Sequence, residues 1–195
     1  MRKFLVLTLI ITLSFGLFTK AAKADTDKDS SSGIICENTY VLCTSAPCIP
    51  DPSNSDTKAI CLCDVNNGKN FGMSECSERT PQTDSRGITK ALSTYSFNQS
   101  PIKPVMMCPD RKPWTNCLDQ PCITDLMNPL KAICTCEIER EQAFITFGGE
   151  CNTLTCDTAY WSGATVDSFN AANKELMKAS GIIDSPVQYC PGQNP

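Results

Sequence analysis

The sequence contains no histidine, and aromatic residues make up only 7% of it. Without histidine the chain cannot build a Ser-His-Asp or Cys-His catalytic centre, a histidine-ligated zinc site or the usual general base near neutral pH. Paired carboxylates would still serve a glycoside hydrolase, but no motif among the 21 Asp and Glu residues singles out a pair. The sequence therefore predicts a protein that is not an enzyme, with no catalytic residue and no cofactor.

The sequence also lacks the Cys-x-x-Cys motif, the spacing used by zinc modules and thioredoxin-like redox sites. Two Cys-x-Cys pairs are present instead, Cys61 with Cys63 and Cys134 with Cys136. Their duplication leaves a metal or redox protein as an alternative. In an exported chain with an even number of cysteines, structural disulfides are favoured. No metal ligand is therefore assigned from the sequence.

The N-terminus has the organisation of a signal peptide. Arg2 and Lys3 precede an apolar run from Phe4 to Phe18, and Ala22-Lys23-Ala24 is a small-x-small cleavage site. The run is shorter than the roughly 20 residues that a membrane-spanning helix needs. We therefore predict a cleaved signal peptide over residues 1–24, a secreted or periplasmic protein, and no membrane association after cleavage.

The net charge of the mature chain excludes some classes of binding partner. Removal of residues 1–24 takes away four basic residues and leaves 13 Lys and Arg against 21 Asp and Glu, a net charge of -8. An acidic chain is a poor ligand for nucleic acid or for an anionic membrane surface. The expected partner is an unidentified protein or surface ligand.

Twelve of the 14 cysteines fall into two sets of six with a nearly constant offset, from 72 residues (Cys36 to Cys108) to 75 (Cys76 to Cys151). The two sets are Cys36, Cys43, Cys48, Cys61, Cys63 and Cys76, and Cys108, Cys117, Cys122, Cys134, Cys136 and Cys151. Neighbouring residues match too, as in Lys58-Ala59-Ile60-Cys61 and Lys131-Ala132-Ile133-Cys134. We interpret this internal repeat as a duplicated module.

The predicted fold is small, disulfide-rich and mainly β, with two tandem homologous six-cysteine modules and a C-terminal amphipathic helix. The predicted divisions of the mature chain are a flexible N-terminal segment (25–35), module 1 (36–76), a connector (77–107), module 2 (108–151) and a C-terminal extension (152–195). The connector contains four Pro and Gly residues among Ser, Thr and Gln, which predicts loops with a short extended patch at Leu92 to Phe97.

Around each Cys-x-Cys the residues alternate as in a strand, with Cys61 and Cys63 on one face and Ile60 and Leu62 on the other. Cysteines two apart on a strand have poor geometry for bonding each other. Each therefore needs another partner. Asn66-Asn67-Gly68-Lys69 predicts a tight hairpin turn after the first such strand.

A D-x-x-N motif precedes each of these strands, Asp51 with Asn54 and Asp125 with Asn128. An Asx turn is the favoured interpretation, and a weak calcium site is the alternative. A turn here brings Cys48 to Cys61 and Cys122 to Cys134, which are the expected disulfides. A one-residue shift of register would offer Cys63 instead of Cys61.

Apolar residues spaced at three and four predict a helix between Thr165, a candidate N-cap, and Gly181, a candidate stop. Cys156 and Cys190 flank this helix and are predicted to bond each other. All 14 cysteines are then in disulfides.

The predicted function is that of an exported, non-enzymatic, disulfide-stapled binding protein. Its expected contact surfaces are the loops between the second and third cysteines of each module, Thr44 to Pro47 and Leu118 to Pro121. A protease inhibitor that uses the same loops is an alternative. Tyr40 and Trp114, near the second cysteines, are expected to pack against disulfides.

Overall fold

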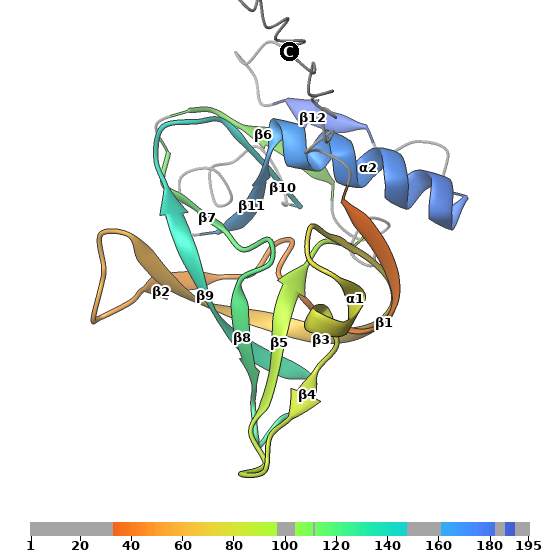
Figure 1. The fold of residues 1–195 in the computed structure, drawn as a ribbon. Coiled ribbons are helices and arrows are strands. Elements are labelled where there is room, and N and C mark those ends of the chain that lie inside the picture. Colours follow the sequence, from red (N-terminus) through yellow and green to blue (C-terminus); the bar gives the residue numbers. More distant parts are fainter. Residues whose placement is uncertain (1–32, 97–103, 111, 148–160, 182–185, 190–195) are drawn as a thin grey trace, which may run out of the picture. The chain divides into compact units, whose positions relative to one another are not determined.

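The computed structural model describes residues 33–96, 104–110, 112–147, 161–181 and 186–189 (Figure 1). All of these residues belong to one compact unit. The predicted signal peptide, Cys151, and the expected Cys156–Cys190 disulfide lie outside the described residues. Within the described ranges, no helix has the length and apolar character needed to cross a membrane.

The described residues are mainly strands, as the sequence predicts, with two helices. The strands are β1 (Ile34–Leu42), β2 (Cys48–Pro50), β3 (Lys58–Gly72), β4 (Gln82–Thr83), β5 (Thr89–Thr94), β6 (Val105–Cys108), β7 (Trp114–Asn116), β8 (Pro121–Thr124), β9 (Lys131–Glu139), β10 (Phe144–Phe147), β11 (Ser162–Thr165) and β12 (Val187–Tyr189), and the helices are α1 (Cys76–Arg79) and α2 (Val166–Ser180). The alternation predicted around Cys-x-Cys is confirmed, because Cys61 and Cys63 are buried while Leu62 is 47% exposed.

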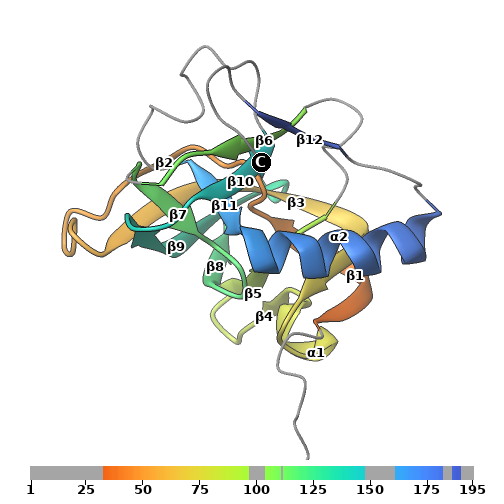
Figure 2. The same cartoon turned by 90° about the horizontal axis from the view of Figure 1, so that it is seen from above.

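The central pair of the sheet is β3 with β9, which run antiparallel. From β3 the hydrogen-bonded neighbours lead through β1, β5 and β8 back to β9, so these five strands form a closed ring (Figures 1 and 2). Closure leaves none of the five as a free sheet edge over the paired residues.

The strands of the two six-cysteine segments pair in the same register. Cys48 lies opposite Cys61 on β2 and β3, as Cys122 lies opposite Cys134 on β8 and β9. The strand that follows each segment also pairs alike, because β5 lies parallel to β1 as β11 lies parallel to β7. The β3–β9 register is symmetric about the Cys61–Cys134 pair, with Lys58 opposite Glu137 at one end and Asp64 opposite Lys131 at the other.

The prediction of a loop-rich connector after Cys76 is wrong at Gln82–Thr83 and from Thr89 to Ala91, whereas residues 84–88 form a turn and the extended patch from Leu92 is confirmed as far as Thr94. This stretch contributes β4 and β5, and β5 lies between β1 and β8 within the ring. Ala91, Ser93 and Thr94 are buried there, which requires small side chains. Their small, polar character resembled a loop in the sequence. The extended patch expected from Leu92 begins at Thr89, and Phe97 lies outside the described residues.

The hairpin turn predicted at Asn66 to Lys69 is also wrong, because β3 continues without interruption to Gly72. The whole second half of β3 pairs with β1, with Asn38 opposite Gly68. That ladder supplies more hydrogen bonds than a local turn would. Gly68 has a φ of 123°, a conformation that favours glycine, so it marks a local distortion of the strand and not its end.

The predicted C-terminal helix is confirmed as α2. The Thr165 hydroxyl caps its N-terminus by accepting a hydrogen bond from the Ser168 N–H (3.1 Å), and Gly181 ends it with a φ of 69°. Phe169, Ala172 and Leu176 form its buried face. They pack with aromatic residues of β3, β10 and the chain after β5, namely Phe71, Phe147 and Tyr95.

Two buried serines hold equivalent positions in the two halves. The Ser93 hydroxyl donates to the Cys117 carbonyl and accepts from the Gln120 N–H (3.1 Å). The Ser162 hydroxyl donates to the Cys43 carbonyl and accepts from the Ala46 N–H (2.6 Å). Each serine therefore ties the strand after one segment to the 43–46 or 117–120 loop of the other.

We expect Ser93→Ala and Ser162→Ala each to lower the free energy of unfolding by about 1–3 kcal/mol, because each leaves buried backbone groups unpaired. Urea denaturation followed by circular dichroism measures this. Ser53→Ala, at an exposed position, is the control and should change stability by less than about 0.5 kcal/mol. A loss in only one of the two buried variants would contradict the equivalence of the serines.

Candidate functional site

Disulfides cross-link the interior of the ring. Five are formed entirely by described residues: Cys36–Cys76, Cys43–Cys63, Cys48–Cys61, Cys117–Cys136 and Cys122–Cys134. The Cys48–Cys61 and Cys122–Cys134 bonds are the two pairs expected from the D-x-x-N turns. Cys108 is disulfide-bonded as well. Cys43–Cys63 is equivalent to Cys117–Cys136 and Cys48–Cys61 to Cys122–Cys134, while the counterpart of Cys36–Cys76 would involve Cys151, outside the described residues; none of the five joins one segment to the other.

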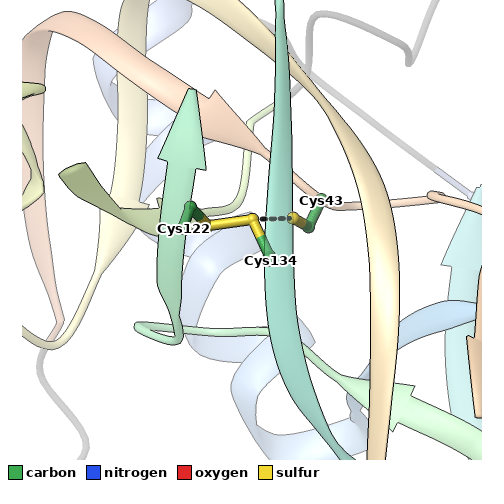
Figure 3. Close-up of side chains that lie close together, drawn as sticks. All are labelled: Cys43, Cys122 and Cys134. Atoms are coloured by element: carbon green, nitrogen blue, oxygen red, sulfur yellow. Dashed lines mark hydrogen bonds between the residues drawn. A yellow bond between two sulfur atoms is a disulfide. The ribbon is translucent and has the colours of Figure 1, made fainter. Parts of the chain in front are cut away.

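Disulfides of the two segments nevertheless contact each other inside the ring. Cys43 Sγ lies 3.4 Å from Cys134 Sγ (Figure 3), and Cys117 Sγ lies 3.5 Å from Cys61 Sγ. The second contact is the counterpart of the first with the segments exchanged. These sulfur atoms form two compact groups, Cys43 with Cys122 and Cys134, and Cys48 with Cys61 and Cys117.

Neither sulfur group is suited to metal binding, because every sulfur in it is already bonded to another sulfur. A metal ligand must be a thiolate. The four Cys-x-Cys sulfurs are likewise all oxidised, so the free thiolates that a metal or redox protein requires are missing from these pairs. The sulfur groups are core packing.

The loops expected to make contacts are largely buried, and only their last residues, Pro47 and Pro121, are exposed. Thr44, Ser45 and Ala46 are only 6%, 4% and 5% exposed, and residues 118–120 are half-buried. Asp119 has a φ of 54° and its carboxylate accepts a hydrogen bond from the Met73 N–H (2.7 Å). The prediction that these loops display a contact surface is therefore wrong for Thr44 to Ala46, which Ser162 holds against the sulfur core, while Pro47 and Pro121 reach the surface. A protease inhibitor that presents Thr44 to Ala46 to a cleft is disfavoured for the same reason.

The D-x-x-N motifs form Asx turns, as favoured from the sequence. The Asp51 carboxylate accepts from the Ser53 N–H, and the Asp125 carboxylate from the Met127 N–H, both at 2.8 Å. Tyr40 and Trp114 are fully buried, and Trp114 packs in one cluster with the disulfide-bonded Cys108, as predicted for it. The Tyr40 hydroxyl donates to Ser96 (2.9 Å), and Trp114 stacks on Phe144. These motifs are structural.

The outer face of the ring carries an open groove of about 820 Å³ over β5, β8 and β9. This volume lies in the range of roughly 300–1,000 Å³ typical of ligand sites. The floor is formed by Ala91, Leu92, Pro121, Cys122, Ile123, Ile133 and Thr135, and the rim by Glu78, Gln82, Thr83, Asp84 and Lys90. Ile123 is 51% exposed and Ile133 is 49% exposed. In the sequence, this groove is indicated by isoleucines at the outward positions of the strands, because polar residues usually occupy the solvent face of a strand.

The rim next to β4 is held in place by a charged turn. The Asp84 carboxylate accepts from the N–H groups of Ile88 (3.0 Å) and Arg86 (2.9 Å) and pairs with the Arg86 guanidinium (3.0 Å). The hydrogen bond from Ile88, followed by that from the Arg86 side chain, lowers the pKa of Asp84. The Asp84 carboxylate in this wall of the groove is therefore ionised and paired with Arg86.

A smaller hollow of about 310 Å³ lies over β2 and β3 and shares Ile133 with the groove. Its Ile49 and Ile60 occupy the positions that Ile123 and Ile133 occupy in the groove. Ile49 is 62% exposed and Leu62 is 47% exposed. An aliphatic face thus extends across β2, β3, β9 and β8, and only its β8 end is walled by β4 and α1.

Comparison with known proteins finds no relative. No protein-family model matches the chain, and neither a curated protein nor a solved structure matches it. A functional proposal therefore depends on the disulfide-linked ring and on the groove.

Proposed function

We propose that the protein is an exported, non-enzymatic binding protein and that the groove over β5, β8 and β9 is its contact surface. The number of disulfides indicates an oxidising extracellular or periplasmic environment. The observation that carries the proposal is the half-exposed pair Ile123 and Ile133 on the groove floor. Burying exposed aliphatic surface on binding contributes about 25 cal/mol of favourable free energy per Å².

The floor of the groove is preorganised. Ile123 and Ile133 lie opposite each other on β8 and β9, and the Cys122–Cys134 disulfide joins these strands one residue away. A surface that does not rearrange loses little conformational entropy on binding. The half-exposed isoleucines require an apolar contact on the partner, while Lys90, opposite Ile123 in the register, and Glu78 and Asp84 place charges beside it.

We further propose that the two six-cysteine segments are homologous modules that arose by duplication. The matched sequences, the equivalent disulfides and the shared register support this proposal. The two modules then differ in their outer faces, because β4 and α1 form a wall beside module 2 and make its groove the larger one.

Nile red, a neutral apolar dye, tests the groove. We expect the oxidised protein to bind the dye, and Ile123→Lys to weaken binding at least tenfold, because the charge lies on the apolar floor. Ile49→Lys is the matched control, since Ile49 has the same register on β2 but lies outside the groove. Fluorescence titration at protein concentrations too low for self-association measures both. Equal affinities for the wild type and Ile123→Lys would overturn the proposal.

A further inference from the structure

The loop between β8 and β9 exposes three large apolar side chains. Leu126 is 75% exposed, Met127 is 92% exposed and Leu130 is 68% exposed. We call residues 125–130 the apolar loop. The corresponding loop between β2 and β3 has Pro52, Ser53 and Thr57 at the matching positions, so the aliphatic tip belongs to the second segment alone.

The apolar loop is held by hydrogen bonds to two of its own side chains, by one bond to β3 and by a disulfide. Asp125 accepts from the Met127 N–H (2.8 Å), and the Asn128 side chain accepts from the Leu130 N–H (3.2 Å). The Leu130 carbonyl accepts from the Val65 N–H of β3 (2.9 Å). The Cys122–Cys134 disulfide closes the base of the hairpin. These bonds fix the loop while its apolar side chains remain in solvent.

The loop joins the two strands that carry the groove floor. Ile123 precedes Leu126 by three residues, and Ile133 follows Leu130 by three. The groove and the loop tip both expose large aliphatic side chains, Ile123 and Ile133 in the groove and Leu126, Met127 and Leu130 on the loop. Lys90 lies opposite Ile123 in the register and lines the groove with Glu78 and Asp84, and Lys131 beside the loop is paired with Asp64 of its own chain. An exposed apolar tip and a groove with an aliphatic floor therefore occur on one hairpin.

We propose that the groove of one copy receives the apolar loop of a second copy, in a reciprocal dimer. This proposal rests on the proposed function, since it names the partner of that same groove. Exchange of loops about a two-fold axis makes the contact twice and closes the assembly at two. A copy that bound without reciprocity would leave one loop and one groove exposed.

Charge opposes this association and provides a further prediction. Each copy is acidic, with a net charge of -4 for the full sequence and a more negative value once the leader is removed. The side chains that would meet at its centre are aliphatic, so added salt should screen the net repulsion between the two copies and tighten the dimer. A dimer held by ion pairs would weaken instead.

Two variants each remove one side of the proposed contact, the loop or the groove. The loop variant carries Leu126→Ser, Met127→Ser and Leu130→Thr, which makes the loop as polar as its counterpart on β2 and β3. The groove variant carries Ile123→Lys. Each alone should raise the dimer dissociation constant at least 100-fold in sedimentation equilibrium of the oxidised protein, since both copies lose the contact. Ile49→Lys should dimerise like the wild type.

Mixing is the decisive measurement, because the loop variant keeps an intact groove and the groove variant keeps an intact loop. One of the two contacts is then restored, and we expect mixed dimers that are weaker than the wild-type dimer but at least tenfold tighter than either variant alone. Far-UV circular dichroism and the absence of free thiols show that both variants are folded. Failure of folded variants to associate on mixing would overturn the reciprocal contact.

Other outcomes distinguish this proposal from the one it rests on. A wild type that stays monomeric at all concentrations and still binds Nile red through Ile123 would overturn the dimer and leave the groove as a binding site. Loss of both would overturn both proposals. Binding of the monomeric wild type, but not of the loop variant, to phosphatidylcholine vesicles would assign the loop to a lipid surface and also overturn the dimer.

Discussion

Reduction of the disulfides with dithiothreitol is expected to unfold the ring of strands completely. The buried cluster inside the ring consists of seven cysteines with Val41, Ala46, Ala91 and Ala132, and it contains no aromatic residue. Each disulfide contributes about 2–4 kcal/mol, and the small side chains that remain bury too little apolar surface to replace it. Near-UV and far-UV circular dichroism should both lose the native signal on reduction.

Individual disulfides should differ in a predictable way. Cys48→Ala with Cys61→Ala, and Cys122→Ala with Cys134→Ala, should each lower the free energy of unfolding by about 3 kcal/mol, because they close loops of similar separation, 13 and 12 residues. Removal of Cys36–Cys76, with a separation of 40, should cost about 1 kcal/mol more. Urea denaturation of the paired variants measures these values.

Because disulfides of the two segments touch, the losses in the free energy of unfolding on removing two of them are not expected to add. Cys43–Cys63 and Cys122–Cys134 touch through sulfur atoms 3.4 Å apart, so their removal together should depart from additivity by about 0.5–3 kcal/mol. Cys36–Cys76 is outside both sulfur groups, and its removal together with Cys122–Cys134 should be additive within about 0.5 kcal/mol. A reduced protein that keeps a cooperative transition would contradict the whole account of the core.

Local features of this fold were predictable from the sequence because local interactions decide them. The Asx turn at Asp51 brings Cys48 to Cys61, and the Thr165 cap starts α2 within one turn of its own chain. Matching sequence around the second Cys-x-Cys then extends the first pairing to Cys122 and Cys134.

The features that sequence reasoning missed depend on distant partners. Ser93 is buried because it bonds Cys117 and Gln120, which lie 24 and 27 residues away. Asn66 to Gly68 stay extended because β1 supplies their hydrogen bonds. A polar stretch resembles a loop until its partner strand is known.

The groove reverses the usual distribution of side chains in a small sheet protein. The inward positions of β3 and β9 are cysteine and alanine, and their outward positions include Leu62 and Ile133. Disulfides provide the cohesion that aliphatic residues normally provide in a core. The aliphatic residues are therefore available for the outer face, where they form the proposed contact surface.

Arg79 is the charged group on which stability should depend most. It is fully buried at the end of α1 and donates to the Ile34 carbonyl (2.8 Å) and to the Asn70 side chain (3.2 Å). It also donates to Cys36 Sγ of the Cys36–Cys76 disulfide. Burial lowers the pKa of Arg79, while the charges of Asp119 and Glu75 raise it. The guanidinium therefore joins β1, β3 and a disulfide at one buried point.

We expect Arg79→Met to lower the free energy of unfolding by about 3–5 kcal/mol, because it leaves Asp119 uncompensated and the Ile34 carbonyl without its donor. Adding Asp119→Asn should recover part of this loss, since it removes the isolated charge. Arg79→Lys should be intermediate, because one ammonium group cannot reach all the acceptors of a planar fork. Urea denaturation of the oxidised variants gives these values.

The exposed Arg86–Asp84 pair is the control, and Arg86→Met should lower the free energy of unfolding by less than about 1 kcal/mol. Equal losses for Arg79→Met and Arg86→Met would show that the buried guanidinium does not hold these strands together.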